Sequence, residues 1–582
     1  MVQLLTSLFR KHDQRARAKA FNAFALMAVL TLTSCANLSA SRNGSTKPFV
    51  PSAVASAVLL EPQFSSEAHK VGAWSQVFDW PGVAIHAALL PSGKVLTFST
   101  ASGDQRSVIS DPESSVSPHN TTQYVIWNPS QNRFETSSGS SVEMFCAGQT
   151  FDTDGNLIVV GGHGGMRKGG LLNQVELYAG IKAANQFNPA TSSWSRLPDM
   201  KGTRWYPSAI TLGTGEILVL GGTHNNTMDS SAINPEVWNG TNWRELTEAG
   251  PNPSMTQTAP DLLLGSVWSG EVEYPKIHLM PDGRVFWNGG GAKYAHLETA
   301  GAGGWTDVRN RSSVDALEHF NGASVMYRPG EILTAGGGEV NGPSNNSAYR
   351  INSDGSTLEL SKLPNLHFKR SYLNSTVLAD GGVAVTDGTS GGGTDKKFNT
   401  PFGVHALELW NPKHPDSWLL GPSASVTRGY HGVALLLPDA RVLTAGGGAC
   451  GSCGGQNNNA ELYYPPYLFK KDGSGQLAAR PVIANAPAQV KYGEAFTIKL
   501  KQPVSVSRVT LVRLGAVTHT FNMNQRFLAP AWSYGPSAPA DPLETVVVNA
   551  PTNPNAAPPG HYLLFVFDGQ GVPSIAKIVQ IR

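Results

Sequence analysis

The stretch Gly148–Gly162, GQTFDTDGNLIVVGG, decides the fold class. It reads as a short apolar strand, a turn with Asp and Gly, a second apolar strand and a closing Gly-Gly. The same phrase recurs at Ala87–Ser99, Ser208–Gly222, Ile277–Gly290, Ala323–Gly337, Ser375–Gly388 and Gly432–Gly447. Seven copies over about 360 residues give a repeat of about 50 residues, the size of a kelch-type propeller blade. A closed ring is therefore predicted, with an open solenoid as the alternative.

The pattern changes after the last repeat. Alternating strands separated by Gly, Pro and Asn turns are predicted at Ala495–Leu500, Arg508–Leu514, His519–Asn524, Thr545–Asn549, His561–Phe567 and Ala576–Ile581. This pattern is typical of an immunoglobulin-like sandwich of about 100 residues. The predicted fold is all-β: a seven-bladed kelch-type β-propeller over residues 70–478, followed by an immunoglobulin-like β-sandwich over residues 479–582. Only 15% of residues are charged, and 62 Gly and 39 Pro favour short strands and turns.

The first residues have the pattern of an export signal. Five basic side chains precede an apolar run from Ala20 to Leu32, and small residues follow before Cys35. We expect residues 1–35 to be a secretory or lipoprotein signal with Cys35 as the lipidated residue; a signal peptide cleaved nearby is the alternative. Residues 36–69, rich in Ser, Ala, Asn and Pro, are expected to form a flexible tether. The protein is then exported, either as a lipid-anchored protein of the cell envelope or into the medium.

Net charge argues against a nucleic-acid partner. The whole chain carries +2 at pH 7, and residues 1–34 hold five basic side chains and one acid, so the mature chain carries −2. No basic face is implied. We expect a monomer that acts on small molecules.

Three cysteines remain once Cys35 is assigned to the signal. Cys450 and Cys453 lie in GGGACGSCGG, and an oxidising compartment favours a local disulfide between them. A zinc half-site is the alternative, but no second cysteine pair completes it. Cys146 is left unpaired. An odd thiol in an exported protein is either buried and inert or chemically used.

Aligning the repeats brings reactive side chains into register. Counting back eight positions from the turn residue before the second strand ends on Cys146, Tyr206 and His431 in three copies. In the other four copies the count ends on Ala84, Tyr274, Asn321 and Tyr372. Equivalent positions of a rotational repeat lie in one layer, so these side chains should surround one central channel. A layer holding Cys, three Tyr and a His is unusual for plain packing.

Such a set of side chains suits a metal. Imidazole with mixed nitrogen and oxygen donors favours Cu(II) among the borderline metals. One His is too few, and His519 in the C-terminal domain is a candidate for the second imidazole, on or beside a hairpin that could enter the channel. Tyr430, next to His431, is close enough to contribute.

Four motifs together resemble the galactose oxidase/glyoxal oxidase family of copper-radical oxidases. They are Phe145-Cys146, Arg204-Trp205-Tyr206-Pro207-Ser208, Arg428-Gly429-Tyr430-His431 and the stretch Thr518–Arg526. The loop with Cys450 and Cys453, followed by Glu461–Leu468, is also similar. The resemblance covers about residues 70–582, and the form of the second motif is closer to the glyoxal oxidase branch.

The resemblance implies a role for each site residue. Tyr206 would be an equatorial copper ligand that is joined to Cys146 by a thioether and carries a stored radical. His431 and His519 would complete the equatorial protein ligands, and Tyr430 would be the axial ligand and the base. The implied reaction is oxidation of a primary alcohol or small aldehyde, with O2 reduced to H2O2. Copper alone moves one electron, so a two-electron oxidation needs a second redox group beside it.

The chain also departs from the family pattern. His224 stands where galactose oxidase has a tryptophan stacked over the radical, and Trp205 is a candidate substitute whose alternative role is packing between strands. Tyr274 and Tyr372 either line the pocket or fill the channel. The other hypothesis for function is a non-catalytic kelch propeller that binds a glycan or protein at the cell surface.

Overall fold

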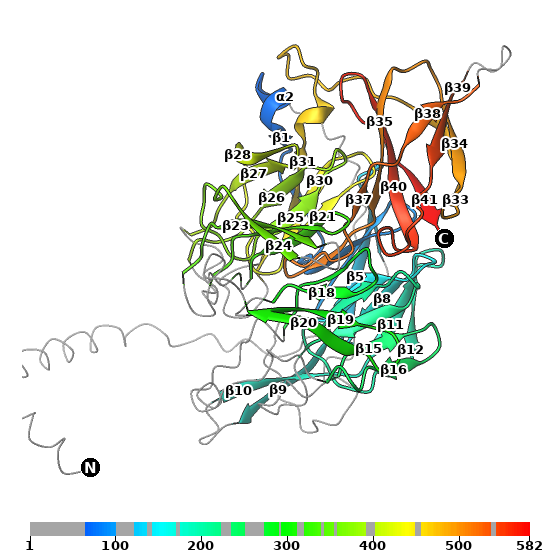
Figure 1. Cartoon of the computed structure of the whole chain (residues 1–582). Coiled ribbons are helices and arrows are strands. Elements are labelled where there is room, and N and C mark those ends of the chain that lie inside the picture. The colour runs from blue at the N-terminus through cyan, green and yellow to red at the C-terminus, as the bar shows by residue number, and fades with distance from the viewer. Residues whose placement is uncertain are drawn as a thin grey trace, which may run out of the picture. The chain divides into compact units, whose positions relative to one another are not determined.

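The computed structural model describes residues 64–100, 122–136, 143–169, 175–222, 234–250, 273–289, 293–310, 319, 321–338, 343–353, 358–391, 402–448, 456–536 and 543–582. The expected signal with Cys35 and the loop with Cys450 and Cys453 lie outside these residues. No helix in the described part of the chain is long and apolar enough to cross a membrane. Nearly all regular structure in these ranges is β (Figure 1), which confirms the predicted all-β class.

Seven antiparallel sheets of the described residues contain the seven repeat phrases, and each is named here by the first strand of its phrase. The strands follow one another in chain order from the first strand outward, so each phrase forms the first hairpin of its sheet. The strands are β3 (His86–Leu89), β4 (Val95–Thr100), β5 (Thr122–Asn128) and β6 (Arg133–Thr136); β7 (Gly148–Phe151), β8 (Leu157–Val160), β11 (Ala184–Asn188) and β12 (Ser193–Leu197); β13 (Ser208–Thr211), β14 (Ile217–Leu220), β15 (Glu236–Trp238) and β16 (Trp243–Glu245); β17 (Ile277–Leu279), β18 (Val285–Trp287), β19 (Lys293–Glu298) and β20 (Gly304–Asn310); β21 (Ala323–Arg328), β22 (Glu331–Ala335), β23 (Ala348–Ser353) and β24 (Leu358–Leu363); β25 (Asn374–Val377), β26 (Val383–Thr386), β27 (Ala406–Asn411) and β28 (His414–Ser423); and β29 (Gly432–Leu436), β30 (Val442–Gly446) and β31 (Asn459–Tyr464). A separate two-stranded sheet pairs β9 (His163–Gly169) with β10 (Val175–Gly180).

First strands of successive sheets contact each other. Strand β7 contacts β13, β13 contacts β17, β21 contacts β25, β25 contacts β29, and β29 contacts β3. A hydrogen bond of 2.8 Å between His278 on β17 and Ser324 on β21 links one further pair of neighbours. These strands are buried along their length because each is covered by its own sheet on one side and by its neighbours on the other.

The last sheet is completed by the start of the described chain. Strands β1 (Ala73–Trp74) and β2 (Phe78–Asp79) both pair with β31, and Figure 1 shows β1 beside β31. The Trp74 indole donates a hydrogen bond of 2.9 Å to the Pro422 carbonyl. Residues 64–69, within the stretch expected to be a tether, include the start of α2 (Ala68–Val71), and Phe64 packs against Tyr464 and Phe469.

The C-terminal domain consists of two sheets around a core of its own. One sheet has the order β32-β34-β39-β38 and the other β33-β41-β40-β35-β37. The core between them includes Ile498 and Val548 from the first sheet and Leu564 and Val579 from the second. The elements are η3 (Pro466–Leu468), a short turn before the domain, then β32 (Ile483–Asn485), β33 (Gln489–Val490), β34 (Ala495–Leu500), β35 (Val506–Arg513), β36 (Ala516–Thr518), β37 (Phe527–Leu528), β38 (Trp532–Tyr534), β39 (Glu544–Asn549), β40 (Gly560–Asp568) and β41 (Lys577–Ile581).

One strand of the C-terminal domain joins a repeat sheet instead. Strand β36 pairs with β3, with Thr518 opposite His86, and it also contacts β7. The expected strand at His519–Asn524 is wrong: β36 ends at Thr518, and the chain turns because His519 and Thr520 have φ of 48° and 72°. This left-handed backbone cannot continue a strand.

Candidate metal centre

The aligned repeat positions share an unusual backbone conformation. Six of the seven have positive φ, between 46° and 67°: Cys146, Tyr206, Tyr274, Asn321, Tyr372 and His431. Ala84 is the exception among the seven aligned positions. Non-glycine residues rarely adopt this conformation, and retaining it requires support from the surrounding structure. In this protein, the turn that leads into each first strand holds these residues in the positive-φ conformation.

Backbone hydrogen bonds join these positions from one sheet to the next. The Tyr206 N–H donates to the Cys146 carbonyl at 3.0 Å, and the Tyr274 N–H donates to the Tyr206 carbonyl at 2.6 Å. The Tyr372 N–H donates in the same way to the Asn321 carbonyl at 2.7 Å. The equivalent positions of neighbouring sheets therefore lie side by side.

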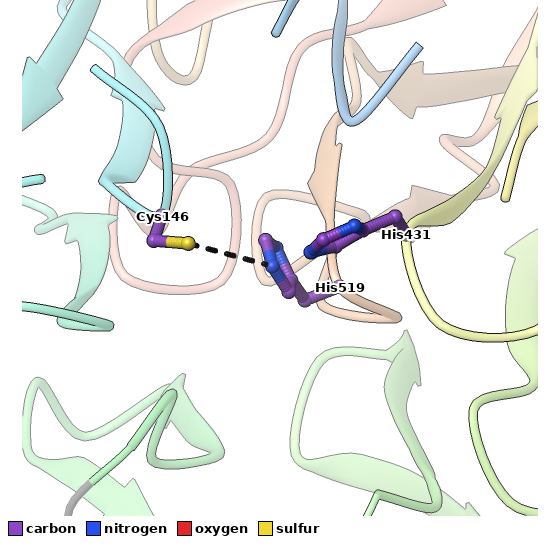
Figure 2. A group of neighbouring side chains, drawn as sticks. All are labelled: Cys146, His431 and His519. Atoms are coloured by element: carbon purple, nitrogen blue, oxygen red, sulfur yellow. Dashed lines mark hydrogen bonds between the residues drawn. The ribbon is translucent and has the colours of Figure 1, made fainter. Parts of the chain in front are cut away.

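Three metal-ligating side chains converge from three separate segments (Figure 2). The ligand atoms of Cys146, His431 and His519 all lie within 4.8 Å of one another. The Cys146 Sγ lies 4.0 Å from the His519 Nε2. All three residues are buried. Cys146 precedes β7, His431 precedes β29, and His519 follows β36, so one ligand comes from the C-terminal domain.

Each imidazole presents one nitrogen to this cluster. The His431 Nδ1–H donates to the Gly448 carbonyl at 2.6 Å, so its Nε2 carries the lone pair, and that buried Nε2 has no hydrogen-bond partner among the residues that the structure describes. The His519 Nδ1 lies 2.6 Å from the Thr518 hydroxyl, which orients the ring. Burial lowers the pKa of His431 to about 3 and the pKa of His519 well below its usual value. Both rings are therefore neutral, which is the state that binds a metal.

Two phenols complete the centre. The hydroxyl of Tyr206 is hydrogen-bonded to the hydroxyl of Tyr430. Burial, followed by the neighbouring Cys146, raises the pKa of Tyr206 well above its usual value. A buried phenol of this kind stays protonated unless a nearby positive charge stabilises the phenolate.

Tyr206 lies between two aromatic rings. The Trp205 ring stacks on it with centroids 3.9 Å apart and planes inclined by 13°. The Tyr274 ring stacks on it at 4.6 Å and 27°, and the Tyr274 hydroxyl donates to the Ala147 carbonyl. Tyr372 lies edge-on to Tyr430 at 5.3 Å.

Polar contacts anchor the C-terminal segment that carries His519. The Thr518 hydroxyl donates to the Ile85 carbonyl, and the Asn524 side chain accepts from the Thr150 hydroxyl. Further along, the Gln525 amide accepts from the Val377 N–H and donates to the Ser375 carbonyl, and Arg526 donates to the Leu279 carbonyl. The segment thus touches the sheets of β3, β7, β17 and β25.

The chain is similar to several known proteins. The early set domain of galactose oxidase-like proteins matches residues 480–581. A galactose oxidase of Gibberella zeae is 28% identical over 526 residues, which cover 88% of this chain and 71% of that protein. An aldehyde oxidase GLOX of Vitis pseudoreticulata is 25% identical over 576 residues, which cover 90% of this chain and 100% of that protein.

A solved structure is similar over most of the chain. It is described as a novel fungal alcohol oxidase with catalytic diversity among the AA5 family, in complex with copper, and it is 26% identical with a TM-score of 0.74. The alignment covers 88% of this chain and 100% of that one. The chain is therefore similar to galactose oxidase and aldehyde oxidases over most of its length, and its C-terminal residues match the early set domain of galactose oxidase-like proteins.

The buried side chains of this centre fit copper. Two neutral imidazoles, a thiol and two phenols form a donor set of mixed nitrogen, oxygen and sulfur character, which suits copper better than Mg²⁺ or Ca²⁺. Within the described part of the chain the buried Nε2 of His431 has no hydrogen-bond partner, and an unpaired buried nitrogen is costly unless a ligand completes it.

The structure brings together Cys146, Tyr206, Tyr430, His431 and His519, with Trp205 and Tyr274 against Tyr206 and Tyr372 against Tyr430. His224 lies outside the described residues. Sequence reasoning missed Thr518 as the partner of the His519 ring, and it missed Phe521, which stacks on Tyr274 at 5.2 Å. The only available signal was their position beside His519.

Proposed function

We propose that this protein oxidises a primary alcohol or small aldehyde by two electrons and reduces O2 to H2O2. The single observation that carries the proposal is the unpaired, buried Cys146 beside Tyr206, His431 and His519. Relatives named galactose oxidase and aldehyde oxidase, and a neighbour described as an alcohol oxidase, support this substrate range.

In this proposal Tyr206, Tyr430, His431 and His519 hold the copper, and Cys146 is joined to Tyr206. A new bond between the Cys146 Sγ and a ring carbon of Tyr206 releases two hydrogens, which O2 accepts as H2O2. Copper supplies one of the two redox equivalents. The thioether-substituted phenol of Tyr206 holds the other as a radical.

Substrate oxidation then uses two of the phenols. Tyr430 would take the proton of the substrate hydroxyl at its phenolate oxygen; burial raises the pKa of this phenol, and the charge of a bound metal would favour the phenolate. The Tyr206 radical removes hydrogen from the substrate carbon. Trp205, stacked on Tyr206, excludes water from one face of the radical and takes the place that His224 cannot fill.

The finer architecture belongs to the same proposal. The seven repeat sheets form a kelch-type seven-bladed propeller over residues 70–478, supported by the contacts between first strands and by the pairing of β1 with β31. Residues 479–582 form the immunoglobulin-like domain that supplies His519. Residues 1–35 direct export and Cys35 carries a lipid, while Cys450 and Cys453 form a local disulfide.

The competing function is a propeller that binds a partner without catalysis. Such a protein has no need for a buried Cys beside two phenols and two neutral imidazoles. The cost of burying these polar groups together favours the oxidase.

The deciding experiment is mass spectrometry of protein lacking residues 1–35, before and after aerobic loading with copper. We expect a peptide containing Cys146 joined to one containing Tyr206, with two hydrogens lost, only after copper loading. Cys146→Ser is the matched control and should bind copper without forming the link. Tight copper binding without the link in the wild type would disprove the radical mechanism. Folded protein with neither copper nor link would favour the binding module.

A further inference from the structure

Three fully buried arginine–glutamate pairs occupy equivalent places in three of the repeat sheets. In each the Arg precedes the first strand and the Glu lies on the third strand, and every one of the side chains is at most 1% exposed. A buried charge pair is retained only when further hydrogen bonds satisfy both groups. The pairs are Arg204–Glu236 at 2.9 Å, Arg370–Glu408 at 2.7 Å and Arg428–Glu461 at 3.6 Å.

The first pair fixes the turn that leads to Tyr206. The Arg204 guanidinium donates to the Gly221 carbonyl at 2.8 Å and to the Asn234 carbonyl at 2.6 Å. Glu236 accepts the N–H groups of Lys201 and Gly202 at 2.7 and 3.1 Å. The segment from residue 201 to residue 204 is therefore held at both ends, two residues before Tyr206.

The same turn also contacts the previous sheet. The Arg204 carbonyl accepts the Gly162 N–H at 3.0 Å. A Cβ on Gly161 would lie 2.4 Å from that carbonyl oxygen, which explains why the repeat phrase ends in Gly-Gly at this point. The Arg204–Glu236 pair thus sets where the β13 sheet, which follows Tyr206, meets the β7 sheet, which follows Cys146.

In the β29 sheet, the segment between the arginine of the pair and the positive-φ residue is one residue longer. Arg428 donates to the Gly446 carbonyl at 2.8 Å, and Glu461 accepts the Ser425 N–H at 2.8 Å. Arg428 precedes the positive-φ residue His431 by three positions, whereas Arg204 precedes Tyr206 by two. The extra residue is Tyr430, so this turn delivers both a phenol and an imidazole to the centre.

The pair in the β25 sheet has the same chemistry without a ligand. Arg370 donates to the Asp387 carbonyl at 3.1 Å, and Glu408 accepts the His367 N–H at 2.6 Å. The turn leads to Tyr372, which lies edge-on to Tyr430 and outside the donor set. The Arg370–Glu408 pair is therefore an internal control for the effect of such a pair on the copper-radical centre.

We infer that Arg204–Glu236 and Arg428–Glu461 are positioning pairs that set the geometry of the copper-radical centre, beyond their role in stability. This inference rests on the proposed function. The bond between Cys146 and Tyr206 needs the sulfur and the ring carbon close and aligned, and a misplacement of about 1 Å can slow such a step about a hundredfold.

Three matched substitutions test the inference: Arg204→Lys, Arg428→Lys and Arg370→Lys. A lysine ammonium is a point charge that cannot span the carbonyls and the carboxylate that the guanidinium fork bridges. The readouts are the melting temperature, the rate of link formation after copper addition to the full mature chain, and the electron paramagnetic resonance spectrum of bound copper.

We expect all three variants to melt at similarly lowered temperatures. Arg204→Lys should slow link formation by about tenfold or more, and Arg428→Lys should change the copper spectrum. Arg370→Lys should keep the wild-type rate and spectrum. Equal effects on the rate and spectrum in all three variants, or no effect in the first two, would overturn the inference.

A second set of variants covers the case in which a lysine variant does not fold. Glu236→Gln, Glu461→Gln and Glu408→Gln keep the shape and one of the two acceptor oxygens and remove the charge, and the same contrast is expected among them. Failure of the proposed function is distinguishable, because the wild type itself would then form no link.

Discussion

The ring of Trp205 lies flat on the ring of Tyr206, with centroids 3.9 Å apart and planes inclined by only 13°. Trp205 is the residue immediately before Tyr206, so adjacent side chains stack only because Tyr206 has a φ of 62°. The left-handed backbone turns the Tyr206 side chain back toward its predecessor. One backbone feature thus places the phenol in the centre and also covers one of its faces.

We expect the stacking of Trp205 on Tyr206 to lengthen the lifetime of the Tyr206 radical. Trp205→Leu removes an aromatic contact worth about 0.5–1.5 kcal/mol beyond its buried area, so the radical should decay about two- to tenfold faster. Trp205→Phe should decay at an intermediate rate. The decay of the radical signal after oxidation measures this. Equal lifetimes in all three proteins would mean that the ring only packs between strands.

The hydroxyl of Thr518 should tune copper affinity. It lies 2.6 Å from the His519 Nδ1, and partners of this kind orient a metal-binding imidazole. Thr518→Val should raise the copper Kd about 10- to 100-fold. Thr520 is the matched control, because its buried hydroxyl has no hydrogen-bond partner among the described residues and Thr520→Val should leave the Kd unchanged. Titration of copper against both variants tests the difference, and equal Kd values would contradict it.

His278 should make the fold sensitive to acid. Burial and the nearby charges of Arg526 and Lys276 lower its pKa from 6.5 to about 3. Below pH 6.5 the unfolded chain takes up a proton that the folded chain does not, so stability falls as the pH falls. The loss is about 1.4 kcal/mol per pH unit, and therefore about 2 kcal/mol between pH 6.5 and pH 5.

The variant His278→Gln isolates that contribution. Its side chain can still bond Ser324 but does not titrate, so the loss of unfolding free energy between pH 6.5 and pH 5 should be about 2 kcal/mol smaller than in the wild type. Urea unfolding at the two pH values measures this. Parallel losses in both proteins would show that His278 is protonated in the folded state.

The short strand β1 should contribute to stability out of proportion to its length. Its Trp74 bonds Pro422 and packs against Tyr463, and β1 covers the edge of β31. Trp74→Ala should cost about 2–3 kcal/mol, on the scale of truncating a large side chain at a packed site. A chain that starts at residue 64 should melt like the longer protein, whereas one that starts at residue 81 should aggregate through the bare strand edge. Equal melting of all the variants would refute this role.

Much of the centre was predictable because it lies in the repeat. The turn lies eight residues after the aligned position in each copy, so a count along the sequence aligns Cys146, Tyr206 and His431 without any structure. The same count reaches Tyr274, Asn321 and Tyr372, and these positions share the positive φ. In a rotational repeat, a fixed spacing in the sequence becomes an equivalent position around an axis. The local sequence pattern was therefore enough to predict which side chains lie in one layer.

His519 and its surroundings were not predictable in the same way. Its segment belongs to no repeat, and its expected strand is a turn. It reaches the centre because β36 pairs with β3, more than 400 residues away in sequence, and because Gln525 and Arg526 bond the sheets of β25 and β17. These side chains bond backbone groups of the sheets, and a backbone group gives no sign in the sequence of which side chain it will meet.

The sequence by itself determined the all-β class, the repeat and the set of reactive side chains that face one layer. Only the tertiary structure decided which partner orients each of them: Thr518 for His519, Gly448 for His431, Trp205 for Tyr206, and Glu236 for the arginine before that tyrosine. The physical reason is that strand and turn patterns arise from neighbours in the chain. The orientation of a buried side chain depends instead on contacts between segments that the sequence separates widely.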